Sequence, residues 1–468
     1  MSDNLIQTGD KPASSAAEMK FKTYGCKVNT YDTGLLEKRI QANFSFQQSR
    51  PIHILNTCAV TREATLEAVR EARRIKRKNA NAVVVVTGCA AQVDTDEFKD
   101  LSEADLVIAN SHKGQLEDIL TQYLKGQETA RVHKSNIFKK EDLESGGGIE
   151  SHHTRSFLKI QDGCNSFCTF CVIPFARGKS RSLAIADLRA RVNEFYDQGL
   201  REVVLTGVHI GDYEEGLEAL VEDLLLNTKM PRLRLASLEP IEVTSRLLDA
   251  YQDPRLCAHF HMSIQSANTS VLAGMKRKYT SNEVEFALNE IARRVPGAYV
   301  GMDVIAGFAG ESDADFQDTY MRLASLPWTR IHVFPYSERP GTFALKLDGK
   351  VESRTLHARA AQLRELSWNR VLQEAKKQIG QTKNVLILKN QAAGEEKLTA
   401  EGRLILPSVA RDQWPIDVTV GDRVERSFLA DQGDFNFSDE IQVKITGYRE
   451  RLSRQDVVLV GEAITRGG

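Results

Sequence analysis

The first 130 residues alternate short apolar runs with helical patterns. Each run is rich in β-branched or aromatic residues and is bounded by a turn, which is typical of a buried strand. A segment with helical periodicity follows each run, and repeated strand–helix units predict a doubly wound parallel α/β domain. The predicted strands are 19–26, 53–58 and 82–89, and the predicted helices are 31–41, 61–78 and 93–101.

The same alternation returns after residue 153. Helical patterns such as 185–199 and 284–295 separate the apolar runs. Such repetition of strand and helix produces either an open sheet or a barrel. The six predicted strands of this region are 157–161, 202–207, 232–237, 259–265, 299–307 and 330–336.

The pattern changes again after residue 349. Residues 350–379 carry apolar side chains at helical spacing and predict one long connecting helix. Short alternating segments follow, and they predict a small all-β barrel, an architecture that oligonucleotide binders use. An accessory folding domain is the alternative for this barrel. Its predicted strands are 384–389, 402–407, 416–430, 440–451 and 456–463.

A chain of 468 residues is too long for one ordinary domain. We expect a disordered start (1–18), an N-terminal domain (19–130), a polar linker with a glycine triplet (131–153), a central domain that includes the connecting helix (154–376) and a C-terminal barrel (377–465). The start lacks the apolar segment of a secretory signal, and no apolar run approaches the roughly 20 residues of a membrane span. We therefore expect a cytoplasmic protein with no membrane partner.

Three of the seven cysteines end the strands predicted for the N-terminal domain. They are Cys26, Cys58 and Cys89, spaced by about 31 residues, roughly one strand–helix–strand unit. Because ligands of an open parallel sheet lie beyond the carboxyl ends of its strands, we expect these thiols to converge. Three converging thiolates suit an iron–sulfur cluster with one iron left open, and a three-cysteine zinc site with an outside ligand is the alternative.

A second group of three cysteines follows the first strand of the central domain, where such folds keep their chemistry. This group consists of Cys164, Cys168 and Cys171. Three cysteines cannot all pair in disulfides with one another, and they are one ligand short of a tetrahedral zinc site. A structural zinc ion on two of them is the alternative, but the chain has no second C-x2-C pair to complete it. We interpret Cys257, the seventh cysteine, as a buried structural residue.

The spacing C-x3-C-x2-C resembles the signature of the radical S-adenosylmethionine (SAM) superfamily. The resemblance implies that three thiolates hold three irons of a [4Fe–4S] cluster and that SAM chelates the fourth. Further segments resemble motifs of the methylthiotransferases, most closely the group that modifies threonylcarbamoyladenosine in tRNA. These segments are "GCKVN", "NTCAVT", "TGCAAQ", "KIQDGCNSFCTFCVIPFARGKSRS", "LTGVHIGDY", "RLASLEP" and "HVFPYSERPGT".

The resemblance implies three parts: a methylthiotransferase domain with an auxiliary [4Fe–4S] cluster on the first triad, a radical SAM partial (β/α)6 barrel with a second [4Fe–4S] cluster, and an RNA-binding TRAM-like barrel. The sequence departs from the family at two loop positions, with Ala309 in place of the usual proline and Ala267 in place of glycine. Both departures concern local geometry more than chemistry.

The implied reaction places a methylthio group on C2 of N6-threonylcarbamoyladenosine, 3′ of the tRNA anticodon. The C2–H of adenine is neither acidic nor attached to a leaving group, so acid–base or nucleophilic catalysis has little to act on. A 5′-deoxyadenosyl radical from SAM would supply the reactivity. The implied partners are the tRNA anticodon stem-loop, a low-potential electron donor and a sulfur source.

Other readings of the same residues lead to different functions. Methylthiotransferases also act on isopentenyladenosine in tRNA or on an aspartate of a ribosomal protein. A non-catalytic iron–sulfur RNA-binding protein is the alternative of another class, and two intact triads count against it. A cobalamin-dependent radical SAM enzyme would need a D-x-H-x-x-G loop, which residues 20–130 lack.

Several further residues are candidates for the site. Asn29 and Asn56 flank the first triad. They could bond cluster sulfurs, but we expect them to cap helices instead. His209 follows a strand, as many polar loop residues do, although it could face the active site. The net charge of −1 does not indicate a nucleic-acid binder, so the basic segments 70–78 and 176–181 are the candidates for tRNA phosphates. The candidates for SAM contacts are Gly207, Gln265, Asp303 and Glu311.

Overall fold

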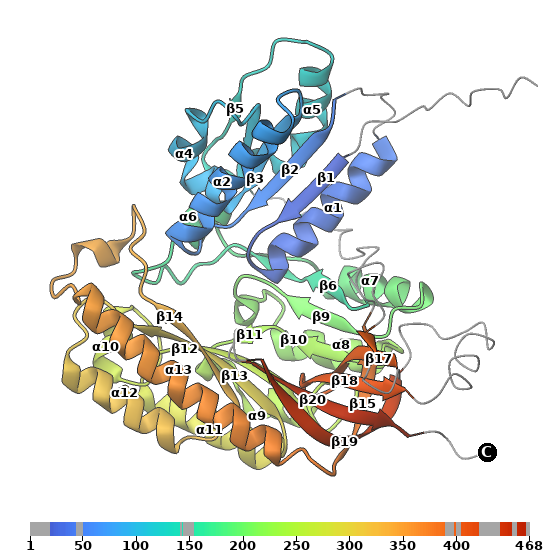
Figure 1. Cartoon of the computed structure of the whole chain (residues 1–468), viewed down its shortest axis with the longest axis vertical. Coiled ribbons are helices and arrows are strands. Elements are labelled where there is room, and N and C mark those ends of the chain that lie inside the picture. The colour runs from blue at the N-terminus through green and yellow to red at the C-terminus, as the bar shows by residue number, and fades with distance from the viewer. Residues whose placement is uncertain are drawn as a thin grey trace, which may run out of the picture.

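The chain folds into three parts that follow one another along the sequence (Figure 1). The computed structural model describes residues 19–43, 50–140, 143, 154–388, 397–398, 404–420, 440–451 and 456–464. The expected disordered start, residues 1–18, lies outside this set. A search of the described helices finds none with the length and apolar character of a membrane span.

The first part is a parallel sheet with helices on both faces. Its centre is buried throughout, as the apolar run Val83–Val86 shows, and a sheet covered on both faces requires this. Helices α1 and α5 pack on one face and α2 and α4 on the other. The sheet order is β1 (Met19–Thr23), β2 (Ile52–Thr57), β3 (Val83–Gly88), β4 (Leu106–Ala109) and β5 (Val132–His133).

The predicted helices and strands of this part are confirmed, and two short strands are added. Strand β5 lies inside the expected linker 131–153 and pairs with β4. Ile137, in the same segment, is buried, so residues 131–140 belong to the folded structure, whereas the glycine triplet of that linker lies outside the described residues. The helices are α1 (Lys27–Asn43), α2 (Arg62–Lys78), α3 (Cys89–Val93), α4 (Thr95–Lys99), η1 (Asn110–Gln115), α5 (Leu116–Leu124) and η2 (Ile137–Lys139).

The central part is the expected partial (β/α)6 barrel. One parallel sheet has the order β10-β9-β6 and a second has the order β11-β12-β13-β14. Only Ala236 separates β10 from β11, so the two sheets continue one another. The strands are β6 (Ser156–Lys159), β9 (Val203–Thr206), β10 (Leu233–Leu235), β11 (Ser237–Leu238), β12 (His259–Gln265), β13 (Tyr299–Ala306) and β14 (Arg330–Pro335).

Helices and short turns connect these strands. The predicted connecting helix is confirmed as α13, which packs along β14. A small antiparallel pair, β7 (Gln161–Asp162) and β8 (Arg181–Ser182), flanks the second cysteine triad. The remaining elements are α6 (Ile173–Arg177), α7 (Ile185–Asp197), η3 (Ile210–Asp212), α8 (Leu217–Asn227), η4 (Pro240–Glu242), α9 (Ser245–Ala250), α10 (Thr269–Gly274), α11 (Ser281–Arg294), α12 (Asp313–Ser325), η5 (Phe343–Lys346) and α13 (Ser353–Lys376).

The third part is a closed β-barrel, as expected. Strand β15 pairs with both β19 and β17, and this double pairing closes the ring. Residues 421–430 of the predicted strand 416–430 lie outside the described residues. The strands are β15 (Thr382–Ile387), β16 (Lys397–Leu398), β17 (Leu404–Ala410), β18 (Pro415–Val420), β19 (Glu440–Arg451) and β20 (Asp456–Ala463).

Candidate functional site

The second cysteine triad lines a hollow at the carboxyl ends of the central strands. The hollow has about 610 Å³ of empty space, part of which is open to solvent. Strand ends and the loops that follow them form its opposite wall. The lining residues are Cys164, Ser166, Cys168, Phe170, Cys171, Ile173, Val208, His209, Ser237, Leu238, Glu239, Ser263, Gln265 and Arg277.

Arg277 is a cation in direct contact with this triad. Its Nη1 donates to Sγ of Cys168 at 3.2 Å, and its Nη2 lies 2.9 Å from Oε1 of Glu239. Backbone amides also donate to the other two sulfurs, at 3.4 Å for Cys164 and 3.5 Å for Cys171. Burial raises the pKa of the Cys171 thiol to about 12, so this group needs a bound metal to become a thiolate at neutral pH.

His209 adds a second positive charge to the hollow. Its Nε2 lies 2.6 Å from Glu242 and its Nδ1 lies 3.1 Å from Asp212. Burial alone would lower the pKa of His209, but hydrogen bonds with Asp212, Cys164 and Glu242 raise it to about 12. A protonated imidazole has no free lone pair for a metal. His209 is therefore an ion-pairing residue of the site, although it lies close enough to Glu239 and Glu242 for the three side chains to hold an ion.

The structure brings the first triad together at the carboxyl edge of the first sheet. Cys58 and Cys89 are buried and Cys26 is exposed. Gly25 has a φ of +90°, and a Cβ there would lie 2.5 Å from Sγ of Cys58, so only glycine allows this approach. Burial, followed by the neighbouring Cys89, raises the pKa of the Cys58 thiol to about 12.

Helix α6 forms a wall between the two triads. It starts two residues after Cys171, and Val172 and Ala176 pack in the same apolar cluster as Cys58 and Cys89. The carbonyl of Ala176 accepts from Asn110 at 2.9 Å, and the same amide nitrogen lies 3.6 Å from Sγ of Cys89. Five helical residues span only about 7.5 Å. The two three-thiol sites therefore share one short structural element.

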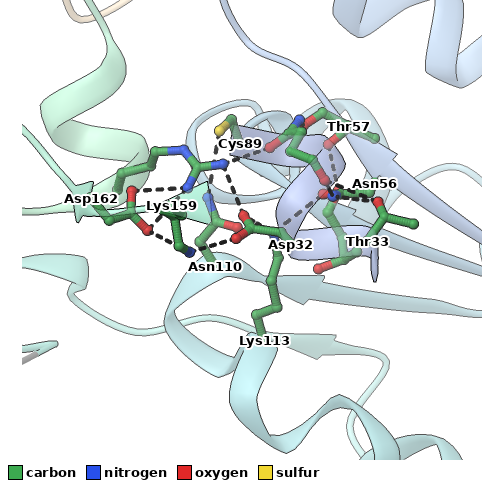
Figure 2. Close-up of polar contacts among 12 residues, drawn as sticks. Asp32, Thr33, Asn56, Thr57, Cys89, Asn110, Lys113, Lys159 and Asp162 are labelled. Carbon is green, nitrogen blue, oxygen red and sulfur yellow. Dashed lines mark hydrogen bonds and ion pairs between the residues drawn. The ribbon is translucent and has the colours of Figure 1, made fainter. Parts of the chain in front are cut away.

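A buried network of charges joins the first and central parts behind these sites (Figure 2). Asp32 on α1 accepts from Lys159 at 2.6 Å, from Arg177 at 3.0 Å and from Lys113 at 3.2 Å. Arg177 also donates to Asp162 at 2.9 Å. Burial opposes ionisation of Asp162, yet Arg177 and Lys159 hold the pKa of this carboxyl at about 2. All of these groups are buried.

Asn29 and Asn56 do not cap helices, which corrects our prediction. The amide of Asn29 donates to the carbonyls of Tyr24 and Thr57, and its oxygen accepts from Arg177 at 2.6 Å. Asn56 donates to the carbonyl of Asn29 at 2.9 Å. Both side chains tie the ends of β1 and β2 to α1, because each has a donor and an acceptor for groups that a strand end leaves unpaired.

The two basic segments, which we expected to contact tRNA phosphates, have some of their cations paired within the protein. Arg177 of the segment 176–181 is buried in the charge network, so it does not face solvent as a phosphate ligand would. In the segment 70–78, Lys76 pairs with Asp105 at 2.8 Å.

Cys257 is fully buried, as we expected of a structural residue.

The four candidates for SAM contacts lie in different surroundings. Gln265 lines the hollow and has a φ of +62°. Gly207 lies against Gln161, although the next two residues line the hollow. Asp303 pairs with His261 at 2.9 Å, and Glu311 is buried and pairs with Arg359 at 2.8 Å. The structure therefore brings Gln265 to the triad but not Asp303 or Glu311.

Sequence reasoning missed two charged residues of the hollow, Arg277 and Glu239. Glu239 stands in the motif "RLASLEP" directly after β11, and that place at a strand end was a usable signal. Arg277 follows α10 in a charged run, "MKRKY", in which no local pattern separates a buried arginine from an exposed one.

A partial parallel barrel with three clustered thiols at an open hollow defines a radical SAM protein. The family described as the Radical SAM superfamily matches residues 158–323, and the Uncharacterized protein family UPF0004 matches residues 18–109. A solved structure of the radical SAM methyltransferase TsrM from Kitasatospora setae superposes with a TM-score of 0.50 and 14% identity, over 69% of this chain and 74% of that one. This likeness concerns the fold alone.

Curated relatives indicate which group of radical SAM proteins this chain resembles. The Threonylcarbamoyladenosine tRNA methylthiotransferase MtaB of Aquifex aeolicus is 37% identical over 381 residues, which are 79% of this chain and 93% of the relative. The tRNA-2-methylthio-N(6)-dimethylallyladenosine synthase of Psychrobacter arcticus is 28% identical over 82% of each chain. The chain belongs to the radical SAM tRNA methylthiotransferase family.

Proposed function

We propose that this protein converts N6-threonylcarbamoyladenosine, immediately 3′ of the tRNA anticodon, to its 2-methylthio derivative. The observation that carries the proposal is the 37% identity to a relative of that name across 93% of its length. Two three-thiol sites in one chain support the same assignment, because methylthio transfer needs both a radical and a source of sulfur.

The residues present fit two [4Fe–4S] clusters and one SAM. Each site offers three soft thiol ligands, which suit iron–sulfur clusters and leave one iron open. Cys164, Cys168 and Cys171 would hold the cluster that binds SAM, and Cys26, Cys58 and Cys89 the auxiliary cluster. When bound, the first cluster and SAM supply a 5′-deoxyadenosyl radical, and the auxiliary cluster supplies a site for the sulfur.

The chain's own residues prepare the SAM hollow for these ligands. Arg277 and His209 place positive charge beside the thiols, which favours the thiolates that a cluster needs. Glu239 neutralises Arg277 across the hollow and fixes its guanidinium. Gln265 presents an amide to the same space, where it can donate to a carboxylate and accept from an amine.

The first triad differs in its access to solvent. Cys26 is exposed, whereas Cys58 and Cys89 are buried. Burial nevertheless raises the pKa of the Cys26 thiol, so this sulfur is desolvated although the residue as a whole is exposed. Asn110 donates toward Cys89 from the inner side, and such donors stabilise sulfur ligands in the thiolate form.

Analysis of modified nucleosides tests the proposal. Transfer RNA from cells that lack this protein should contain threonylcarbamoyladenosine without its 2-methylthio group. Wild-type protein should restore the group, and a Cys164→Ala variant should not. Loss of the 2-methylthio group from isopentenyladenosine instead would support the function of the Psychrobacter relative. An unchanged nucleoside profile would refute a tRNA substrate.

A further inference from the structure

Three phenylalanine rings form a cluster at the rim of the SAM hollow. Phe138 belongs to η2, Phe167 stands between Cys164 and Cys168, and Phe175 lies on α6. The ring centroids of Phe138 and Phe167 are 6.2 Å apart, with the planes 21° from parallel. Phe175 meets both rings edge-on, at 5.9 and 6.1 Å.

Two rings of this cluster are exposed although they are large and apolar. Phe167 is 39% exposed and Phe175 is 43% exposed, while Phe138 is half-buried. Phe167 also has a φ of +46°, a left-handed conformation that is rare for bulky residues and costs free energy. Exposed aromatic clusters and backbone strain at a site both indicate binding rather than packing.

The cluster borders the hollow, and two exposed lysines are close to its rings in the sequence. Ser166 and Cys168, the neighbours of Phe167, both line the hollow, and so does Ile173 on the same helix as Phe175. Lys139 and Lys179 are exposed, one next to Phe138 and the other just after α6. Aromatic faces combined with cations are the chemistry by which proteins hold unpaired nucleotides.

We propose that Phe138, Phe167 and Phe175 are a stacking platform for an unpaired base of the anticodon loop. The base would flank the nucleotide whose C2 enters the hollow, and the two lysines would face the backbone phosphates. This inference rests on the proposed function, because RNA loops present splayed bases that stack on aromatic side chains, whereas paired RNA does not.

Binding of a synthetic anticodon stem-loop that carries threonylcarbamoyladenosine tests the platform. The wild type is compared with a double variant, Phe167→Ala combined with Phe175→Ala, and with the single variants Phe175→Leu and Phe175→Tyr. The control is Phe286→Ala on α11, where the ring is 63% exposed. All are reconstituted and compared at equal iron content, so that a lost cluster is not taken for lost RNA binding.

The double alanine variant should bind the stem-loop about 10-fold more weakly or worse, as alanine substitutions of base-stacking residues do. Phe175→Leu should also bind more weakly, because it keeps apolar size but has no ring. Phe175→Tyr and Phe286→Ala should bind as the wild type does.

Four results would overturn the platform, and the last of them would overturn the proposed function as well. If the double alanine variant binds the stem-loop with wild-type affinity, the platform is refuted. The proposed function would not be affected, because the nucleoside analysis tests it separately. Full binding by Phe175→Leu would show that a ring is not needed. A change in oligomeric state without a change in RNA affinity would assign the cluster to contact between copies of the chain. A wild-type protein that binds no stem-loop would refute both proposals.

Discussion

Replacing Asp32 by asparagine measures how strongly the buried ion pairs hold the first and central parts together. The carboxylate of Asp32 faces Lys113, Lys159 and Arg177, all of them buried. Asparagine has nearly the same size but carries no charge, so three buried cations would lose a shared counter-ion. Removing one partner of a buried ion pair typically costs about 3–5 kcal/mol, because the remaining charge is left uncompensated.

Urea unfolding followed by two signals should show where this loss acts. The three tryptophans, Trp328, Trp368 and Trp414, all lie beyond the first part, so their fluorescence reports on the other two parts. In Asp32→Asn, the circular dichroism signal should show an early transition that precedes the fluorescence change, since loss of the network uncouples the first part.

Two further variants control this experiment. Asp118→Asn removes an exposed carboxylate on α5 of the same part, and it should change the free energy of unfolding by no more than about 0.5 kcal/mol. Asp32→Asn combined with Lys113→Met should recover part of the loss, because one uncompensated cation is removed as well. If Asp32→Asn unfolds like Asp118→Asn, in a single transition, the network does not hold the two parts together.

Three other predictions follow from the same sites. The pKa of Asp162 is lowered from 3.8 to about 2. The ionised carboxylate therefore stabilises the fold above about pH 4, and this stability is lost as the pH falls toward 2. Urea unfolding at a series of pH values would measure the loss. Anaerobic reconstitution should load about eight irons per chain, and changing the second triad to alanine should leave about four and abolish SAM cleavage, as iron analysis and product assays would show. Changing the first triad to alanine should leave SAM cleavage to 5′-deoxyadenosine but stop methylthio transfer to tRNA; a folded variant that still methylthiolates would exclude the auxiliary site from the reaction.

Much of the fold could be predicted because most of its strands are apolar runs bounded by turns. The run Val83–Val86 has apolar residues at every position, which is what a strand buried on both faces requires. Strand β5 has only two residues, too few to show a pattern, whereas β4 was missed although its four residues are all apolar and buried. Cys58 and Cys89 directly follow β2 and β3, so the expected place of these two cysteines at the carboxyl edge of the sheet could be predicted from the strand pattern.

The contacts between parts could not be predicted from local patterns. Arg177 stands in a basic segment and resembles a phosphate ligand, but its counter-ion Asp32 is 145 positions away in the sequence. Asn29 follows a strand and precedes a helical pattern, as a cap would, and only the folded chain brings Thr57 and Arg177 to its amide. The role of such residues depends on partners that are distant in sequence.

Helix α6 explains why the two triads must be considered together. Its first turn follows Cys171 and contains Pro174, which fixes the backbone there. Its last residue, Arg177, is locked into the network with Asp32 and Asp162. The same short helix is thus tied to both parts of the chain. On the proposed function, the RNA loop must reach the site of the sulfur and the site of the radical, which this helix separates. A platform at Phe175, on this same helix, would hold that loop against the wall between them.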